Sequence, residues 1–285
     1  MREESVLPMA GTTSAARAAV RYNQRFFHYP SMPANIIPRA ILDALALADP
    51  SWQPHLLQGL QAVARANPDY LLALAAEYYL PTGQRLFAAF ALPLSEVRHV
   101  LVGEGPYPRA ESATGVCFMD GAVGDLWSDT GLSKAVNRAT SLRNFLKMLL
   151  VADGQLHADA SSGAALAPVA AHARTNGAIQ TLAQLQANLT RHGFLLLNAA
   201  LVFRPHVPPV LEALAWRPFL QTVLGALAGS NAKLVLWGKI AEQLKKLPEC
   251  AALEQVCSEH PYNLSFIQHA QMQALFGPMQ LLRAP

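Results

Sequence analysis

Short apolar runs alternate with helix-like spacings along most of the chain. Four runs are nearly continuous and are bounded by turn residues, and they cover residues 98–102, 193–198, 233–238 and 253–260. A run of this length that is apolar at consecutive positions is typical of a strand buried on both faces. Because helical spacings separate the runs, the pattern predicts a three-layer α/β/α fold with a central four-stranded parallel sheet.

Helical spacing is clearest in three segments. From residue 52 to residue 79, apolar residues recur every three or four positions, which predicts helices with one buried face. The segment 141–151 predicts a helix with Ser141 as its N-cap. Another helix is expected over residues 177–191.

The N-terminal part of the chain differs from the rest. Residues 1–50 are largely small and polar and contain three closely spaced prolines, so they predict a partly flexible N-terminal extension. Residues 51–285 are expected to form one domain. Within it, residues 153–176 contain few bulky side chains and predict a mobile loop insertion.

Composition narrows the class of protein. Hydrophobic residues make up 52% of the chain and charged residues 14%, which indicates a globular body. The net charge of +3 is compatible with a nucleic-acid partner but does not identify one. The three cysteines form no CxxC pair and cannot make a disulfide framework or a four-cysteine iron–sulfur cluster, so a cytoplasmic protein without metal or cofactor is expected. No apolar run approaches the length of a membrane-spanning helix.

Each predicted strand ends in a chemically distinctive cluster. The clusters are Gly103–Pro108, Asn198, Gly238–Lys239 and His260–Ser265. Taken singly, each is explained as a turn or an extended dipeptide. Because ligands bind outside the carboxyl ends of parallel strands, where all four clusters should meet, together they predict a binding site at that edge.

Three of these clusters carry motifs of a known family, and residues 51–280 resemble the family-1 uracil-DNA glycosylases. The loop "GEGPYP" at 103–108 resembles the family's water-activating loop, and Phe118 follows it at the family's spacing. The stretch "GFLLLNAALVFRPH" at 193–206 resembles the uracil-reading strand, and "HPYNLS" at 260–265 resembles the minor-groove loop.

The resemblance implies a base-excision repair enzyme that flips uracil out of DNA and hydrolyses its N-glycosidic bond. Phe118 would stack on the flipped base, and Asn198 would read its polar edge through one donor and one acceptor. Tyr107 would exclude the methyl group of thymine. His260 would donate a hydrogen bond to the carbonyl oxygen that becomes negative as the bond breaks.

The same resemblance assigns three residues to DNA. Leu264 would fill the space that the base leaves in the duplex, and Ser141 and Ser265 would hold phosphates. The expected partner is uracil-containing DNA, single- or double-stranded. We expect a monomer that does not associate with membranes.

The first motif departs from the family at the residue that activates water. The family has Asp there, and this chain has Gly105, preceded by Glu104 where Gln is usual and followed after Tyr107 by Pro108 where His is usual. Since a general base contributes about 10²–10⁴ in rate, the absence of Asp bears directly on catalysis.

Three interpretations stay open. The chain is an active glycosylase in which Glu104 replaces the Asp. Alternatively, it is a weak or inactive glycosylase fold that binds DNA or a protein partner. The third interpretation is that the substrate is a different base. Gly105 differs from the family in the pocket, and Tyr262 and Asn263 differ from it in the minor-groove loop at 260–265.

Overall fold

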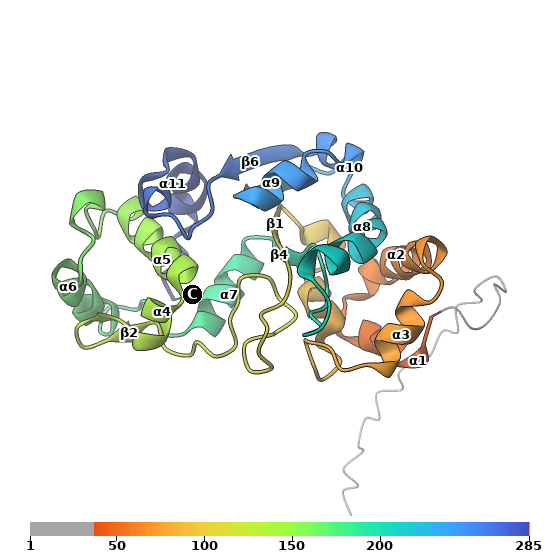
Figure 1. The fold of residues 1–285 in the computed structure, drawn as a ribbon. Helices are drawn as coiled ribbons and strands as arrows, with labels where there is room; N and C mark the ends of the chain where they lie inside the picture. The colour runs from red at the N-terminus through yellow and green to blue at the C-terminus, as the bar shows by residue number, and fades with distance from the viewer. Residues whose placement is uncertain (1–36, 285) are drawn as a thin grey trace, which may run out of the picture. The chain divides into compact units, whose positions relative to one another are not determined.

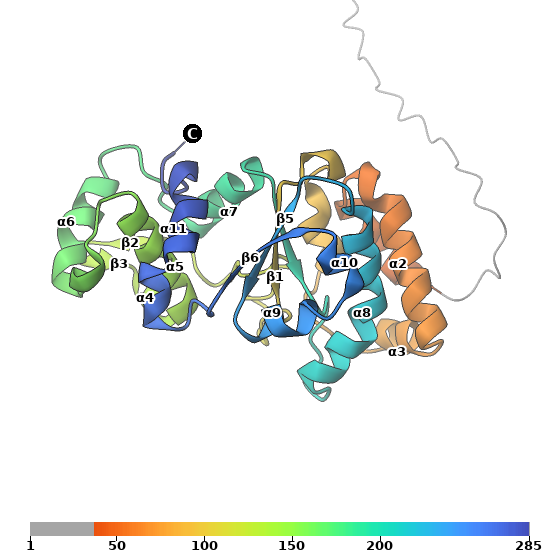
Figure 2. The same ribbon diagram turned by 90° about the horizontal axis from the view of Figure 1, so that it is seen from above.

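A computed structural model describes residues 37–284, in which a parallel sheet lies between two layers of helices (Figures 1 and 2). The sheet has the strand order β4-β1-β5-β6, and all neighbouring strands are parallel. The predicted α/β fold with four central strands is confirmed. Its strands are β1 (His99–Gly103), β4 (Phe194–Asn198), β5 (Lys233–Trp237) and β6 (Glu254–Ser258).

The central strands bury side chains on both faces, which explains their continuous apolar runs. In β1, Val100 and Val102 join the hydrophobic cluster on one side of the sheet, and Leu101 joins the cluster on the other. Strands β4 and β5 alternate in the same way. This alternation follows from the two-residue period of an extended chain.

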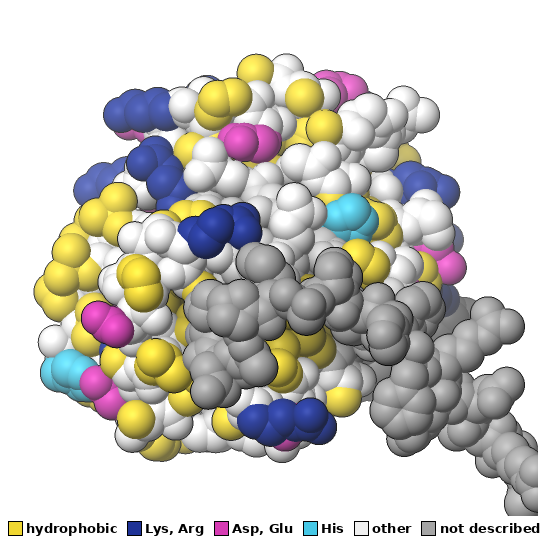
Figure 3. Space-filling view, turned by 90° about the vertical axis from the view of Figure 1, so that its right-hand side faces the viewer, with side chains coloured by type: hydrophobic (Ala, Val, Ile, Leu, Met, Phe, Trp, Pro, Cys, Tyr) yellow, Lys and Arg dark blue, Asp and Glu magenta, His cyan; other side chains and the backbone are white. Residues whose placement is uncertain are grey.

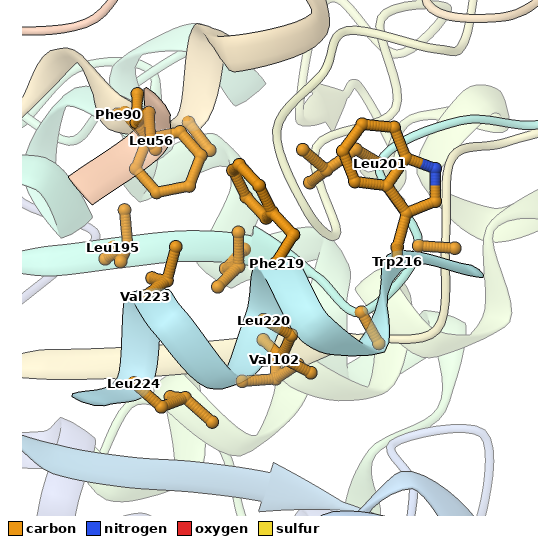
Figure 4. Packing of buried hydrophobic residues seen from close by; sticks show 14 of the residues in the cluster. Leu56, Phe90, Val102, Leu195, Leu201, Trp216, Phe219, Leu220, Val223 and Leu224 are labelled. Carbon is orange, nitrogen blue, oxygen red and sulfur yellow. The ribbon is translucent and has the colours of Figure 1, made fainter. Parts of the chain in front are cut away.

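One helical layer is built around the packing of α8 (Pro209–Ala226) against α2 (Gln53–Ala66). Figure 4 shows Phe219 of α8 pointing into this core near Phe90. A Cβ atom on Gly59 of α2 would lie 2.7 Å from the Phe219 ring, so the missing side chain permits the close approach of the helices. The layer also contains α1 (Arg39–Asp43), α3 (Tyr70–Ala76), α9 (Lys239–Leu244), α10 (Pro248–Ala251) and the 3₁₀ helices η1 (Ala44–Leu47), η2 (Pro50–Trp52), η3 (Arg85–Ala91) and η4 (Leu94–Glu96).

The other layer covers the opposite face with α5 (Thr140–Ala152) and α11 (Ala270–Phe276). Phe145 meets Phe276 edge-on at a centroid distance of 5.1 Å, and Trp237 of β5 lies 5.7 Å from Phe145. Edge-on contacts of this kind add to the stabilisation from burial. The layer also contains α4 (Lys134–Arg138), α6 (Gly163–Ala173), α7 (Leu182–Arg191), the hairpin of β2 (Trp127–Ser128) and β3 (Gly131–Leu132), and the 3₁₀ helices η5 (Ala158–Ala160), η6 (Leu264–Gln268) and η7 (Gly277–Met279).

The folded unit begins before residue 51, so the predicted domain boundary is wrong. Ile41 and Ala44 are buried in the core beside α2 and α3, because α1 and η1 present an apolar face after the last of the three prolines. The flexibility predicted for the earlier part of the extension concerns residues 1–36, which lie outside the described residues.

The predicted loop at 153–176 is wrong over residues 163–173. Residues 163–173 form α6, and Leu166 and Ala170 are buried in the second core cluster. Small residues are compatible with a helix here because alanine favours helix and permits close packing. The following helix, expected from residue 177, begins at Leu182, where Thr181 and Gln184 form a capping box.

Ser141 does not have the predicted N-cap position. Helix α5 begins at Thr140, directly after Ala139, which ends α4 and makes no side-chain cap. The serine therefore lies in the first turn of α5.

Charge is unevenly distributed over the face that carries α2 and α3. In Figure 3, several Lys and Arg side chains lie near one another at the upper left, and the others that are visible are spread singly among apolar side chains. No helix among residues 37–284 is both long and apolar enough to cross a membrane.

A buried ion-pair network holds the chain that follows β4. Arg204 donates from Nε to Glu212 Oε1 at 2.6 Å and from Nη1 to Glu77 Oε2 at 3.0 Å. Burial alone would lower the pKa of Arg204, but these carboxylates raise it, so the guanidinium stays charged. The Tyr70 hydroxyl donates to Glu212 Oε2 at 2.5 Å.

We expect Arg204→Met to destabilise the protein by about 3–5 kcal/mol, because it leaves the Glu212 carboxylate buried without its partner. The double variant Arg204→Met/Glu212→Leu should recover much of the loss, since both charges are then gone. Denaturant unfolding at neutral pH measures both. The exposed pair of Arg39 and Asp43 supplies the control, in which Arg39→Met should change stability by less than about 0.5 kcal/mol. Equal stability of Arg204→Met and the parent would contradict the assignment.

Candidate active site

The carboxyl ends of the strands surround a cavity of about 250 Å³. Gly103 pairs with Asn198 at the ends of β1 and β4, and Trp237 pairs with Ser258 at the ends of β5 and β6. The predicted site edge therefore carries a real cavity. Seven of the predicted site residues line it, namely Glu104, Gly105, Tyr107, Phe118, Ser141, Asn198 and His260.

Gly103 permits close packing at the end of β1. A Cβ atom at this position would lie 2.5 Å from Cys117 Sγ and 3.1 Å from Asn198 Oδ1, so a side chain would displace both. The loop that follows is tied to the other strand by two backbone hydrogen bonds, in which Ala199 N–H donates to the Gly103 carbonyl and Ala200 N–H to the Glu104 carbonyl. These bonds set the position of the 103–108 loop relative to Asn198.

Phe118 is held in an unusual backbone conformation. Its φ is +67°, a region that residues with side chains rarely occupy, and such strain is concentrated at functional sites. Its ring meets Phe145 edge-on at 5.4 Å and Trp237 edge-on at 5.2 Å. These aromatic contacts fix the orientation of the ring at the cavity wall.

Asn198 brings an amide into the cavity wall. Only 5% of the residue is exposed, and its side chain makes no hydrogen bond within residues 37–284. Because its amide atoms are not among the fully buried polar atoms without partners, they reach the cavity, where a ligand or water can pair with them. The site is thus prepared for a ligand that offers both a donor and an acceptor.

His260 is held as a neutral hydrogen-bond donor at the cavity rim. Its Nδ1 accepts the backbone N–H of Tyr262 at 3.1 Å, so the proton of the neutral ring must lie on Nε2. Partial burial lowers the pKa of His260 below its usual value of 6.5, and the negative charge of Glu104 opposes this shift. A Cβ atom on Gly238 would lie 2.8 Å from the His260 Cβ, so the glycine leaves room for the histidine.

Glu104 is the only carboxylate among residues 37–284 that lines the cavity. It is exposed, and its charge reaches His260. The other ionisable groups in the wall are neutral, because burial raises the pKa of Tyr107 and raises the pKa of the Cys117 thiol to about 12. No group of three His, Cys, Asp or Glu side chains in the described part of the chain could hold a metal ion.

The loop after His260 is held by a residue that the sequence analysis missed. Asn144 of α5 is completely buried and donates from Nδ2 to the carbonyl of Pro261 at 2.7 Å. Longer contacts of 3.2 and 3.4 Å reach the carbonyls of Tyr262 and Asn263. One feature of the sequence could have predicted this role: Asn144 lies on the apolar face of a predicted helix, where a polar side chain needs hydrogen-bond partners.

The two remaining predicted residues lie outside the cavity. Leu264 is 69% exposed, and Ser265 is also exposed, on the loop that Asn144 holds. The structure therefore brings the residues predicted to contact the base together in one cavity, whereas Leu264 and Ser265 lie outside it.

The chain is similar to known proteins over most of its length. The family model of the uracil DNA glycosylase superfamily matches residues 90–279. The chain belongs to the uracil-DNA glycosylase superfamily. The resemblance that the loop motifs carry is thereby confirmed at the level of the superfamily.

Individual relatives support the assignment over most of the chain. The crystal structure of wild-type UNG from Nitratifractor salsuginis is 40% identical, has a TM-score of 0.79, and covers 86% of this chain and 97% of its own. The uracil-DNA glycosylase of Nocardioides sp. is 29% identical over 77% of this chain and 81% of its own length. A mimivirus UNG variant in complex with UGI has 17% identity and a TM-score of 0.50, which supports the fold alone.

We expect Asn144→Ala to destabilise the protein by about 1–3 kcal/mol, since three loop carbonyls lose a buried donor. Amide exchange of Tyr262 and Asn263 should also become faster, because both N–H groups bond to His260 in the held loop. Asn188 is the matched control, as its Nδ2 donates to the carbonyls of Leu281 and Arg283. Asn188→Ala should lower stability without affecting exchange in the loop. Unchanged loop exchange in Asn144→Ala would refute the role.

Glu104→Gln should lower the pKa of His260 further, because the variant removes the negative charge that favours the imidazolium form. The protonated ring should then appear only at lower pH than in the parent. An NMR titration of the ring signals measures this shift. His99, whose pKa burial lowers at the other end of β1, is the internal control and should titrate unchanged. An unchanged or higher pKa of His260 would contradict the proximity of the two groups.

Proposed function

We propose that the protein removes uracil from DNA by flipping the nucleotide into this cavity and hydrolysing the N-glycosidic bond. The observation that carries the proposal is the meeting, in one cavity, of an unpaired buried amide, an aromatic ring, a neutral imidazole donor and one carboxylate. Relatives named uracil-DNA glycosylase across most of the chain support the same substrate.

Recognition would depend on Asn198. Its side chain offers one acceptor and two donor hydrogens, which match the adjacent N–H and carbonyl of uracil. The same edge of cytosine presents a different pattern of donors and acceptors and would fit less well. Phe118 would stack on the base, and the neutral phenol of Tyr107 would occupy the space beside its C5 atom.

Hydrolysis would then proceed with Glu104 and His260. The bond between the sugar C1′ and the base N1 breaks, and its electron pair goes to uracil, whose carbonyl oxygen accepts a hydrogen bond from His260 Nε2–H. A donor already in place for a developing negative charge stabilises the transition state without reorganisation. Water adds to C1′ and gives a proton to the Glu104 carboxylate.

The position of the usual Asp is open to a side chain. Gly105 does not have a positive φ, and a Cβ atom there would meet Ala200 only at 3.7 Å, an ordinary contact distance. A Cβ atom can therefore be accommodated at position 105, and crowding at that atom does not explain the absence of Asp. This feature favours a second candidate function, a glycosylase fold that binds DNA without efficient catalysis.

Two variants distinguish the candidates. We expect Glu104→Gln to reduce uracil release from a single-uracil oligonucleotide by about 10²–10⁴-fold, because it removes the general base. Adding Gly105→Asp to that variant should restore at least about tenfold, equivalent to about 1.4 kcal/mol of barrier. Single-turnover assays of abasic-site formation measure both rates.

The control is Glu111→Gln, which removes an exposed acid from the same connection outside the cavity and should leave the rate unchanged. If Glu104→Gln retains the parental rate, Glu104 is not the working acid. If the parent binds uracil DNA but releases no base, and Gly105→Asp creates activity, the DNA-binding function is favoured instead. Release of another damaged base but not uracil would indicate a different substrate.

A further inference from the structure

The loop at 260–265 exposes a second large side chain beside Leu264. Tyr262 is 67% exposed, although the neighbouring Pro261 and, further along, Phe266 are buried. The loop is therefore anchored at both ends and presents its apolar side chains between the anchors. Adjacent exposed apolar side chains at the rim of a cavity mark a surface that another molecule covers.

Hydrogen bonds hold the backbone around Tyr262 in place. Its carbonyl lies 3.2 Å from Asn144 Nδ2, and its N–H donates to His260 Nδ1. The Asn263 N–H donates to the His260 carbonyl at 2.9 Å, which closes the turn around Tyr262. A side chain on a backbone that is already ordered loses less conformational freedom when it binds.

We propose that Tyr262 is an aromatic wedge that stacks on a nucleobase next to the position vacated by the flipped nucleotide. This inference rests on the proposed function, because it takes the cavity to be the site of the flipped base. The backbone bond to His260 keeps Tyr262 directly beside the cavity rim. Every base has an aromatic face, so stacking on a tyrosine ring would be independent of sequence.

The surroundings favour DNA as the occupant. Arg143 lies beside Asn144, the residue that holds the 260–265 loop, with its Nε 3.5 Å from Asn144 Oδ1. It supplies positive charge next to the loop. Its Nη1 donates to the Asn137 carbonyl at 3.0 Å, and Arg143 forms no ion pair with a carboxylate among residues 37–284. A cationic side chain next to exposed aromatic and aliphatic groups combines phosphate attraction with base stacking.

Binding to a duplex that contains a tetrahydrofuran abasic site, with 2-aminopurine as its 3′ neighbour, tests the proposal without requiring catalysis. At constant salt, Tyr262→Ser should weaken binding by about 5- to 100-fold, the range of affinity that one base–aromatic stack supplies. Tyr262→Phe keeps the ring and should bind like the parent. In Tyr262→Ser the fluorescence of bound 2-aminopurine should rise, since the probe loses its stacking partner.

The matched control is Tyr78→Ser, which removes a tyrosine that is 59% exposed after α3. Its affinity and fluorescence should equal those of the parent, and thermal unfolding should show that both serine variants are folded. Parental affinity in Tyr262→Ser, or no binding of the abasic duplex by the parent, would overturn the proposal. A ring-dependent loss of affinity in a protein that releases no uracil would uphold the wedge and refute only the proposed function.

Discussion

The close packing of Gly103 against Cys117 and Asn198 is the contact on which the cavity depends. It brings the end of β1 against the end of β4 and against the segment that carries Phe118. With any larger residue at position 103, the Asn198 amide and the Cys117 thiol could not both remain where they are. The absence of a side chain at position 103 therefore lets Asn198 line the same cavity as Phe118.

The electrostatics of the cavity are those of a nearly neutral site with one acid at its edge. Tyr107 and Cys117 keep their protons because burial disfavours their anions. His260 stays neutral because partial burial disfavours the imidazolium, even with Glu104 nearby. A neutral donor that is already in place can stabilise a negative charge that develops in a transition state without reorganisation.

The rim of the cavity depends on a buried polar residue outside the base pocket. Asn144 connects α5 to the loop that carries His260, Tyr262 and Leu264. Helix α5, which carries Ser141 at the cavity, thus also holds the exposed loop at 260–265. This connection reaches the loop at the carbonyls of Tyr262 and Asn263.

The sequence by itself determined the four strands, their parallel arrangement and the edge at which the site lies. Continuous apolar runs between helical spacings leave few other folds, and parallel strands necessarily end at the same edge. The motifs further identified the residues that line the cavity, from Glu104 to His260. These predictions depended on local pattern and order along the chain, which a sequence displays directly.

Only the tertiary structure decided what depends on contacts between distant segments. Leu166 and Ala170 make 163–173 a packed helix where composition predicted a loop, because burial against the hairpin favours helix over a solvated chain. The hydrogen bond from Asn144 to Pro261 joins residues more than a hundred positions apart. The space beside Gly105 is bounded by Ala200, which follows a different strand. Such contacts arise from the packing of the layers, which no local pattern encodes.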